Sequence, residues 1–216
     1  GFFGSSTATT KNVHSVSTVV GSELNGDSIN IIAGGSVAVK ASELTAANTI
    51  AINATRDISV ESGRNTQSIK PAEFEIQKSR VNGGAVLLNA GNDITLTTAE
   101  VRGSGLANSS TPSTAVVAGG NLNISSEQIS RKTVAGGVTT QSLLTDRSSI
   151  SGENGLVIYG GKSIDASAVD LNSANGGVSV VSKGDITLVY NTDTVQKNWT
   201  TSSSSRSWYG KTTTTV

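Results

Sequence analysis

The chain has 216 residues, 35% of them hydrophobic, and its 16 basic and 16 acidic residues balance to a formal net charge of zero. This balance excludes the basic footprint of a nucleic-acid-binding protein, and the absence of cysteine excludes disulfides, thiolate metal sites and a cysteine nucleophile. Twenty-four glycines against two prolines favour short strands and tight turns over long helices. No stretch approaches the ~20 apolar residues of a membrane helix, and because methionine is absent we expect a segment of a longer protein.

Two segments beginning with Ser-Glu-Leu follow each other at a spacing of 20 residues, at Ser22 and Ser42. Each contains two short apolar stretches separated by a corner of small, Asn, Asp or Gly residues. Apolar residues alternate within each stretch, and this period of two predicts strands. Residues 22–62 are therefore predicted to form two coils with two strands each.

The same pattern returns in four later segments, at 83–99, 113–126, 154–168 and 175–190. A strand pair of this kind cannot bury its apolar face alone, so periodic copies predict stacked coils about 4.8 Å apart. We expect an all-β fold, a right-handed parallel β-helix, with residues 1–216 as a single segment and the further coils at 81–126 and 150–190.

The inward side chains of these strands are predicted to form an apolar ladder along the axis. Its members are Ile29, Ile31, Val37, Val39, Ile50, Ile52, Ile58, Val60, Ile94, Leu96, Leu122, Ile124, Ile164, Ile186 and Leu188. Six of these residues open the second strands, at spacings of 21, 36, 28, 42 and 22 positions: Val37, Ile58, Ile94, Leu122, Ile164 and Ile186. We interpret 42 as about two periods, and 36 and 28 as single periods with insertions.

Residues 63–80 and 127–149 keep the alternation but lack the corner pattern, so they are predicted to be strands that leave the helix. The second is expected to form a β-hairpin around Gly136 and Gly137, and Pro71 in the first suits an edge or a turn. These excursions would cover a face of the rod or present a binding surface.

The first ten residues, GFFGSSTATT, and the last ten, SWYGKTTTTV, share an aromatic pair, a glycine and a Ser/Thr run. Residues 191–216 are therefore predicted to begin the next copy of a larger repeat. The aromatic pairs, Phe2 with Phe3 and Trp208 with Tyr209, are expected to pack at these junctions.

Three corners place an aspartate just before the second strand, at Asp57, Asp93 and Asp185. Asp tolerates left-handed backbone angles and bonds locally to its own turn, so a turn role is predicted. Calcium binding is the alternative, although the GGxGxD arrays of calcium-binding β-helices are absent. We predict no metal site and no cofactor.

Parallel β-helices also include polysaccharide-cleaving enzymes, which need two carboxyl groups about 5 to 9.5 Å apart in one cleft. No closely spaced acidic pair beside Arg or Lys stands out, and fold analogy alone does not indicate catalysis. His14 is the only histidine, which excludes a serine triad and a multi-histidine metal site. No catalytic residue is predicted.

A carbohydrate- or receptor-binding surface remains an alternative. Its candidate aromatic residues are Phe74, Tyr159, Tyr190, Trp199 and Trp208. The open terminal coils of the rod also predict end-to-end self-association.

Three stretches of the chain carry a resemblance to a known family: GFFGSSTATT leading into VVGSELNGDSINIIAGGSVAVKASEL, then AGNDITLTTA, and SKGDITLVY. They are similar to the haemagglutinin repeats of large bacterial exoproteins made by two-partner secretion. That family includes filamentous haemagglutinins and contact-dependent growth inhibition effectors, and the resemblance covers most of the chain. It implies a filament that leaves a Gram-negative cell through a dedicated outer-membrane transporter and is secreted or displayed on the cell surface. It also implies contact with a target-cell surface or receptor, as a virulence-associated adhesin or as a stalk that carries a distal toxin.

Overall fold

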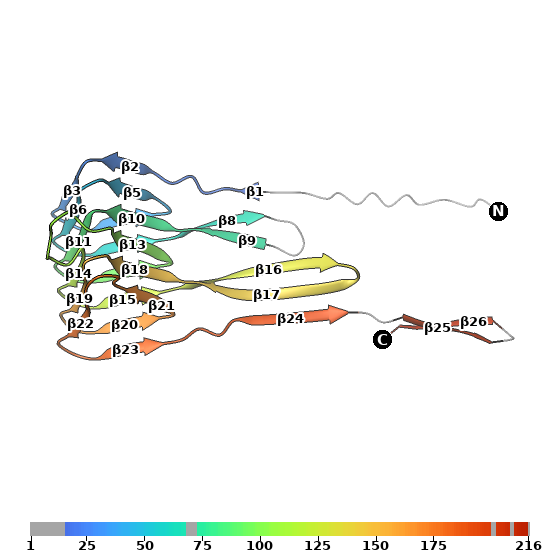
Figure 1. The fold of residues 1–216 in the computed structure, drawn as a ribbon. Helices are drawn as coiled ribbons and strands as arrows, with labels where there is room; N and C mark the ends of the chain where they lie inside the picture. Colours follow the sequence, from blue (N-terminus) through green and yellow to red (C-terminus); the bar gives the residue numbers. More distant parts are fainter. Residues whose placement is uncertain (1–15, 68–72, 200–201, 208–209, 216) are drawn as a thin grey trace.

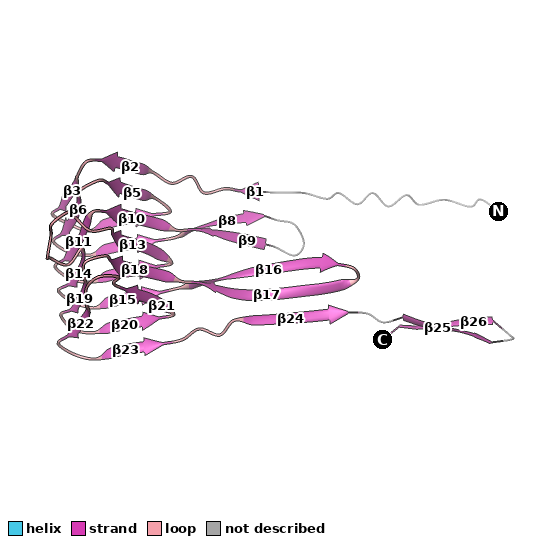
Figure 2. Cartoon of the chain, viewed as in Figure 1, coloured by secondary structure: helices cyan, strands magenta, loops and turns pink. Residues whose placement is uncertain are grey.

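The structure, a computed structural model, describes residues 16–67, 73–199, 202–207 and 210–215. Every regular element in these ranges is a β-strand (Figure 2). Three parallel sheets of six strands run side by side along one axis (Figure 1). The predicted all-β parallel β-helix is confirmed, and its right-handed winding stays a prediction.

Each of the six coils contributes one strand to each sheet, in the order sheet I, sheet II, sheet III. Sheet I contains β2 (Glu23–Gly26), β5 (Glu43–Ala46), β10 (Ser79–Gly83), β13 (Ala99–Gly103), β18 (Ser148–Gly152) and β21 (Val169–Asn172). Sheet II contains β3 (Ile29–Ala33), β6 (Thr49–Ala54), β11 (Ala85–Ala90), β14 (Thr114–Ala118), β19 (Leu156–Gly160) and β22 (Val178–Ser182). Sheet III contains β4 (Val37–Lys40), β7 (Ile58–Glu61), β12 (Ile94–Thr97), β15 (Leu122–Ser125), β20 (Ile164–Ser167) and β23 (Ile186–Val189).

The prediction of two strands per coil was wrong, because it missed sheet I. The Ser-Glu-Leu triplets that marked the repeat lead directly into β2 and β5 of this sheet. Their strands are short and mostly polar: in β5, Leu44 is buried between Glu43 and Thr45. One large inward residue, accompanied only by the small Ala46, is too little alternation to identify a strand from sequence.

The inward side chains of the three sheets meet in one continuous apolar core. Of the predicted ladder, eleven members are buried: Ile29, Val39, Ile50, Ile52, Ile58, Val60, Ile94, Leu96, Leu122, Ile124 and Ile164. Ile31 and Val37 are partly buried against this core, whereas Ile186 is 45% and Leu188 64% exposed. These last two lie in β23, the final strand of sheet III, and therefore have a neighbouring strand on one side only.

Pairing along sheet III corrects one interpreted spacing. Leu122 pairs directly with Ile164 in adjacent strands, so the 42 residues between them are one coil plus an insertion and not two periods. The insertion is a hairpin of β16 (Glu127–Ala135) and β17 (Val138–Asp146).

The expected hairpin turn at Gly136 and Gly137 is present, with φ of +58° and +77°. Positive φ at both central residues matches the twist of a two-residue hairpin, and glycine adopts it without steric cost. The first excursion is likewise an antiparallel pair, β8 (Gly63–Gln67) and β9 (Glu73–Gln77). Pro71 lies outside the described residues.

Both hairpins leave the solenoid at the corner where sheet III passes to sheet I. They are extended by β1 (Val16–Ser17), which pairs with β8, and by β24 (Thr194–Trp199), which pairs with β17. β9 lies against β16, so these six strands form one layer that projects from the rod, here termed the hairpin layer. Sheet II lies on the opposite side of the rod (Figure 1). A separate antiparallel pair, β25 (Ser202–Ser207) and β26 (Gly210–Thr215), follows.

Candidate functional surface

The corner between sheet III and sheet I is where the solenoid and the hairpin layer meet. Three coils turn this corner directly, through one residue in the left-handed region: Ala41 (φ +46°), Thr98 (φ +44°) or Ala168 (φ +50°). At each of the other two corners between coils a hairpin is inserted, so the chain leaves the solenoid and re-enters it at the same corner.

A buried serine closes the base of each hairpin. Ser79 follows the first hairpin, and its hydroxyl donates to the carbonyl of Glu61 (2.6 Å) and accepts the N–H of Ser42 (3.1 Å). Ser148 follows the second hairpin, donating to the carbonyl of Ser125 (2.7 Å) and accepting the N–H of Ala99 (3.1 Å). Both serines are fully buried. Each ties the strand that leaves the solenoid to the strand that re-enters it.

Sequence reasoning missed these two serines, although a signal exists. Both begin a Ser-x-Val/Ile-x-Gly stretch immediately after an excursion, in SRVNG and SSISG. The corresponding strand after a direct corner reads AEVRG, with Ala99 in place of serine. The Ser-x-Val/Ile-x-Gly stretch therefore marks the return from a hairpin, although a serine alone does not, because Ser42 occupies the same register position after the direct corner at Ala41 and accepts the N–H of Ser22.

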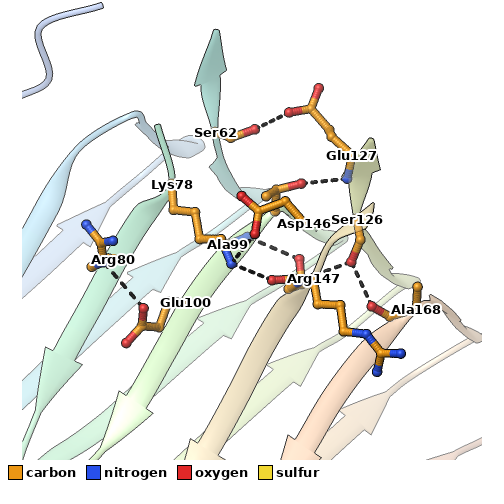
Figure 3. Close-up of polar contacts among 12 residues, drawn as sticks. Ser62, Lys78, Arg80, Ala99, Glu100, Ser126, Glu127, Asp146, Arg147 and Ala168 are labelled. Carbon is orange, nitrogen blue, oxygen red and sulfur yellow. Dashed lines mark hydrogen bonds and ion pairs between the residues drawn. The ribbon is translucent and has the colours of Figure 1, made fainter. Parts of the chain in front are cut away.

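Glu127, the first residue of β16, connects the two hairpins. Its carboxylate accepts hydrogen bonds from the Ser62 hydroxyl and from the Arg64 guanidinium (Nη2 to Oε1, 3.1 Å), as Figure 3 shows for Ser62. Its backbone N–H donates to the Thr98 hydroxyl (2.6 Å). The start of the second hairpin is thus held by the first hairpin and by a direct corner at once.

One ion pair joins the bases of the two hairpins to each other, and a second joins the base of the second hairpin to sheet I. Lys78 Nζ lies 2.7 Å from Asp146 Oδ1, in a site where both side chains are about three-quarters buried, and it also donates to the carbonyl of Arg147 (2.7 Å) (Figure 3). Arg147 in turn pairs with Asp170 of β21 at 2.7 Å. Because the Arg147–Asp170 pair is exposed, we expect it to contribute less to the stability of the fold than the Lys78–Asp146 pair does.

The start of β24 is fixed by Asp193, whose carboxylate accepts the N–H (2.7 Å) and the hydroxyl (2.6 Å) of Thr145. The hydroxyl bond, followed by the backbone bond, lowers the pKa of Asp193 below its ordinary value, and Arg147 adds a smaller effect in the same direction. Hydrogen bonds to the ionised form favour that form.

One face of the outer hairpin sheet carries apolar side chains next to a cation. Trp199, which is 67% exposed, lies opposite Val138, and Val195, which is 60% exposed, lies opposite Ser142. Lys197 occupies the position between them on the same face of β24. An exposed indole, an aliphatic side chain and an ammonium group can together contact a sugar ring or a peptide strand.

The corner aspartates have a different role from the one predicted. Asp57 accepts the N–H of Asp93 (3.2 Å), and Asp93 accepts the N–H of Asn121 (2.7 Å), so each carboxylate bonds the next coil and not its own turn. None of Asp57, Asp93 and Asp185 has a positive φ. Asp185 holds the same position in the last coil, where its carbonyl accepts the N–H of Ile164 (2.9 Å). In a solenoid, the donor nearest to such a carboxylate belongs to the neighbouring coil.

Within the described ranges, no three His, Cys, Asp or Glu side chains converge on a place that would hold a metal ion. The same part of the chain contains no helix that is long and apolar enough to span a membrane. His14, Phe2, Phe3, Trp208 and Tyr209 lie outside the described residues, as does the side chain of Phe74.

A family model described as "Hemagglutinin repeat" matches residues 3–73 and again residues 70–136. The first match ends at Glu73, the first residue of β9, and the second begins between β8 and β9 and ends at Gly136 in the turn of the second hairpin. Each match therefore spans two complete coils and the half-hairpins on either side. No curated protein and no solved structure matches the chain.

Residues 137–199 have the same architecture as the two matched segments. They consist of the returning strand β17, the two coils from β18 to β23, and the outgoing strand β24. Within this third segment β17 pairs with β24, just as β1 pairs with β8 in the first. The repeating unit of the structure is thus two coils plus two half-hairpins.

Proposed function

Because the chain belongs to the haemagglutinin-repeat family, we propose that it is a shaft section of a bacterial exoprotein that makes contact between cells. Repeats of this family are typical of secreted and cell-surface exoproteins. The observation that carries the proposal is the unbroken hydrogen-bonded ladder of all three sheets through six coils, with one dry core. Such a rod supplies length and stiffness, and additional units extend it by stacking alone.

We further propose that the parent protein is exported from a Gram-negative cell through the outer-membrane transporter of a two-partner pathway. The absence of cysteine supports this route, since a chain that crosses a pore unfolded gains nothing from early disulfides. Outside the cell, the shaft carries either an adhesive tip or a toxin for contact-dependent growth inhibition. Its partner is then the surface or a receptor of the target cell.

The shaft is proposed to be non-catalytic. The carboxylates nearest to a catalytic arrangement, Asp57 and Asp93, accept backbone N–H groups of the neighbouring coil. Changing either one is therefore expected to weaken the corner, with no turnover to lose. Polysaccharide cleavage by the purified segment that disappears in Asp93→Asn would support the enzyme alternative instead.

A deletion that respects the repeat tests the shaft function in the full-length exoprotein. Removing residues 70–136 joins β8 to β17, restores a hairpin and shortens the rod by two coils, or about 10 Å. We expect normal surface display and cell contact. The matched control removes 67 residues out of register, 30–96, and should abolish display because β2 and β13, two parallel strands of sheet I, become joined by only five residues. Loss of contact by a normally displayed 70–136 deletion would contradict a purely structural role.

The exposed face of β24 favours a second candidate, a receptor- or carbohydrate-binding role for the hairpin layer. Trp199 and Lys197 supply a stacking surface and a cation beside it. Under this proposal, Trp199→Ala reduces binding of the purified segment to target cells, measured by flow cytometry. Asn198→Ala, on the opposite face of the same strand, serves as the control. Equal binding by the unchanged segment, Trp199→Ala and Asn198→Ala contradicts this second role.

End-to-end self-association of the isolated segment is proposed on the basis of its terminal coils. A hollow of about 450 Å³ beside the last coil is lined by apolar residues that include Ala166, Leu171 and Leu188, and by polar residues near the hairpin base such as Thr145 and Asp193. A second hollow, of about 360 Å³, lies above the first coil and includes Leu24 and Ile31. Both expose core residues that another coil would cover.

A further inference from the structure

The three outer faces of the rod differ in chemistry. Each strand of sheets I and III directs two central side chains outward, and on sheet I these include six charged residues: Glu23, Glu43, Arg80, Glu100, Arg102 and Asp170. Sheet III directs mainly Ser, Thr, Asn and charged side chains outward. Both faces are those of a sheet in contact with water.

Sheet II is different, because its outward positions are mostly apolar and none is charged. Along the axis they read Asn30 and Ile32, Ala51 and Asn53, Leu87 and Asn89, Ala115 and Val117, Val157 and Tyr159, and Ser179 and Val181. Ile32 is 75% and Val181 47% exposed, and the central members are half-buried only by their own neighbours in the sheet. Strands such as AVLLNA and LVIYG are therefore apolar on both faces.

Parallel sheets with near-continuous apolar strands are normally covered on both faces. The hairpin layer does not cover sheet II, because it projects from the opposite corner of the rod (Figure 1). Six strands of about five residues give a flat patch of about 17 Å by 29 Å, or roughly 500 Å². Eight of its twelve outward positions are apolar or aromatic, and a patch of this size lies in the range of the largest patches on monomeric proteins, which are often functional.

We infer that the outer face of sheet II is a lateral interface that binds the same face of a second copy of this chain. The rows of side chains on sheet II repeat at the strand spacing, and a second β-helix presents rows at that same spacing. Two such faces can therefore interdigitate along their whole length, as packed sheets do at a separation of about 10 Å.

Charge and geometry also favour a second copy. The face is neutral, so two copies meet without like-charge repulsion, whereas pairing through sheet I would bury four acidic and two basic residues, each of which would need a partner. Back-to-back pairing through sheet II also leaves both hairpin layers pointing outward and free of each other. This inference does not depend on the proposed shaft function, since it concerns only the surface of the folded segment.

The paired faces would bury about 1,000 Å² in total, the lower limit for a specific protein interface. We therefore expect a reversible dimer of the 216-residue chain, with a dissociation constant between about 1 μM and 1 mM, measured by sedimentation velocity over a concentration series. Leu87→Glu should weaken it at least about tenfold, because a charge would be buried without a partner. Thr95→Glu, which places the same charge on sheet III of the same coil, is the matched control and should leave the dimer unchanged.

Two further variants, one of them with a matched control, distinguish lateral from end-to-end association. Leu188→Glu alters the open end of the rod and should leave the lateral dimer intact. Because the chain has no cysteine, Ala115→Cys introduces a single thiol on sheet II and should give a disulfide-linked dimer under mild oxidation. Asn123→Cys, on sheet III of the same coil, should not. A wild-type chain that stays monomeric throughout, or a dimer lost in Leu188→Glu but not in Leu87→Glu, overturns the inference.

Discussion

The solenoid and the hairpin layer are built from similar short alternating strands, but they bury very different amounts of side chain. In the solenoid, Ile52 of β6 and Leu96 of β12 are fully buried. In the hairpin layer, every residue of β24 is exposed. The solenoid strands are parallel and stacked in register around a shared core, whereas the hairpin strands pair as an antiparallel layer with little to cover them. Alternation of side chains therefore identifies a strand, and the stacking of registered copies decides whether its inward face is buried.

The largest expected difference between the two regions comes from a charge in the core. Ile94→Lys should destabilise the chain by at least about 4 kcal/mol, and Ile58→Lys similarly, because the ammonium group cannot be solvated inside the dry core. Denaturant unfolding followed by circular dichroism measures the effect. Thr95→Lys, one residue further on and directed outward, is the control and should cost less than about 0.5 kcal/mol. Equal stability of the Ile94→Lys, Ile58→Lys and Thr95→Lys variants would show that the coil register is wrong.

The next effect tests the junction between the two regions. Ser148→Ala should cost about 1–3 kcal/mol, because the N–H of Ala99 and the carbonyl of Ser125 both lose a buried partner. Ser79→Ala should behave alike at the first hairpin. Ser149→Ala, on the outer face of the same strand, provides the comparison. If Ser148→Ala and Ser149→Ala unfold at the same denaturant concentration, the buried serine does not close the hairpin.

A smaller effect is expected from removing a hairpin altogether. Deleting residues 127–147 joins Ser126 to Ser148 and recreates the one-residue corner that Thr98 forms in the preceding coil. The solenoid should still unfold cooperatively, with stability changed by about 1–2 kcal/mol from the loss of the partly buried Lys78–Asp146 pair and of the exposed hairpin contacts. A deletion protein that fails to fold would make the hairpin layer part of the folding unit.

The smallest effect is local to β24 and depends on pH. The lowered pKa of Asp193 means that its ionised form stabilises the docked strand. This contribution is complete above the ordinary aspartate pKa and is lost as the pH falls through the lowered value, below about pH 4. Protection factors of the β24 amides, which correct for the intrinsic pH dependence of hydrogen exchange, should fall on acidification while those of β12 stay high. Asp193→Asn should remove the pH dependence; its persistence in that variant would assign it to another group.

The sequence alone determined the fold class and much of the register. Val37, Ile58, Ile94, Leu122, Ile164 and Ile186 were recognised as equivalent positions, and they occupy one register position along sheet III. They were recognisable because an inward strand position in a solenoid meets the same environment in every coil, so its apolar character repeats. The hairpin turn at Gly136 and Gly137 was equally local, since its backbone angles favour glycine.

Only the tertiary structure decided where the pieces lie. Sheet I escaped prediction because one large buried apolar residue per strand, such as Leu44 or Val101, with only small residues at the other inward positions, leaves no visible alternation. The roles of Ser79, Ser148 and Asp93 depend on partners in other coils, which no local pattern reveals. Both hairpins leave the solenoid at one corner, and the apolar outer face of sheet II lies opposite that corner. This arrangement follows from how the coils stack. A repeat therefore encodes its own strands, whereas the faces of the rod arise from the alignment of residues that are a whole coil apart.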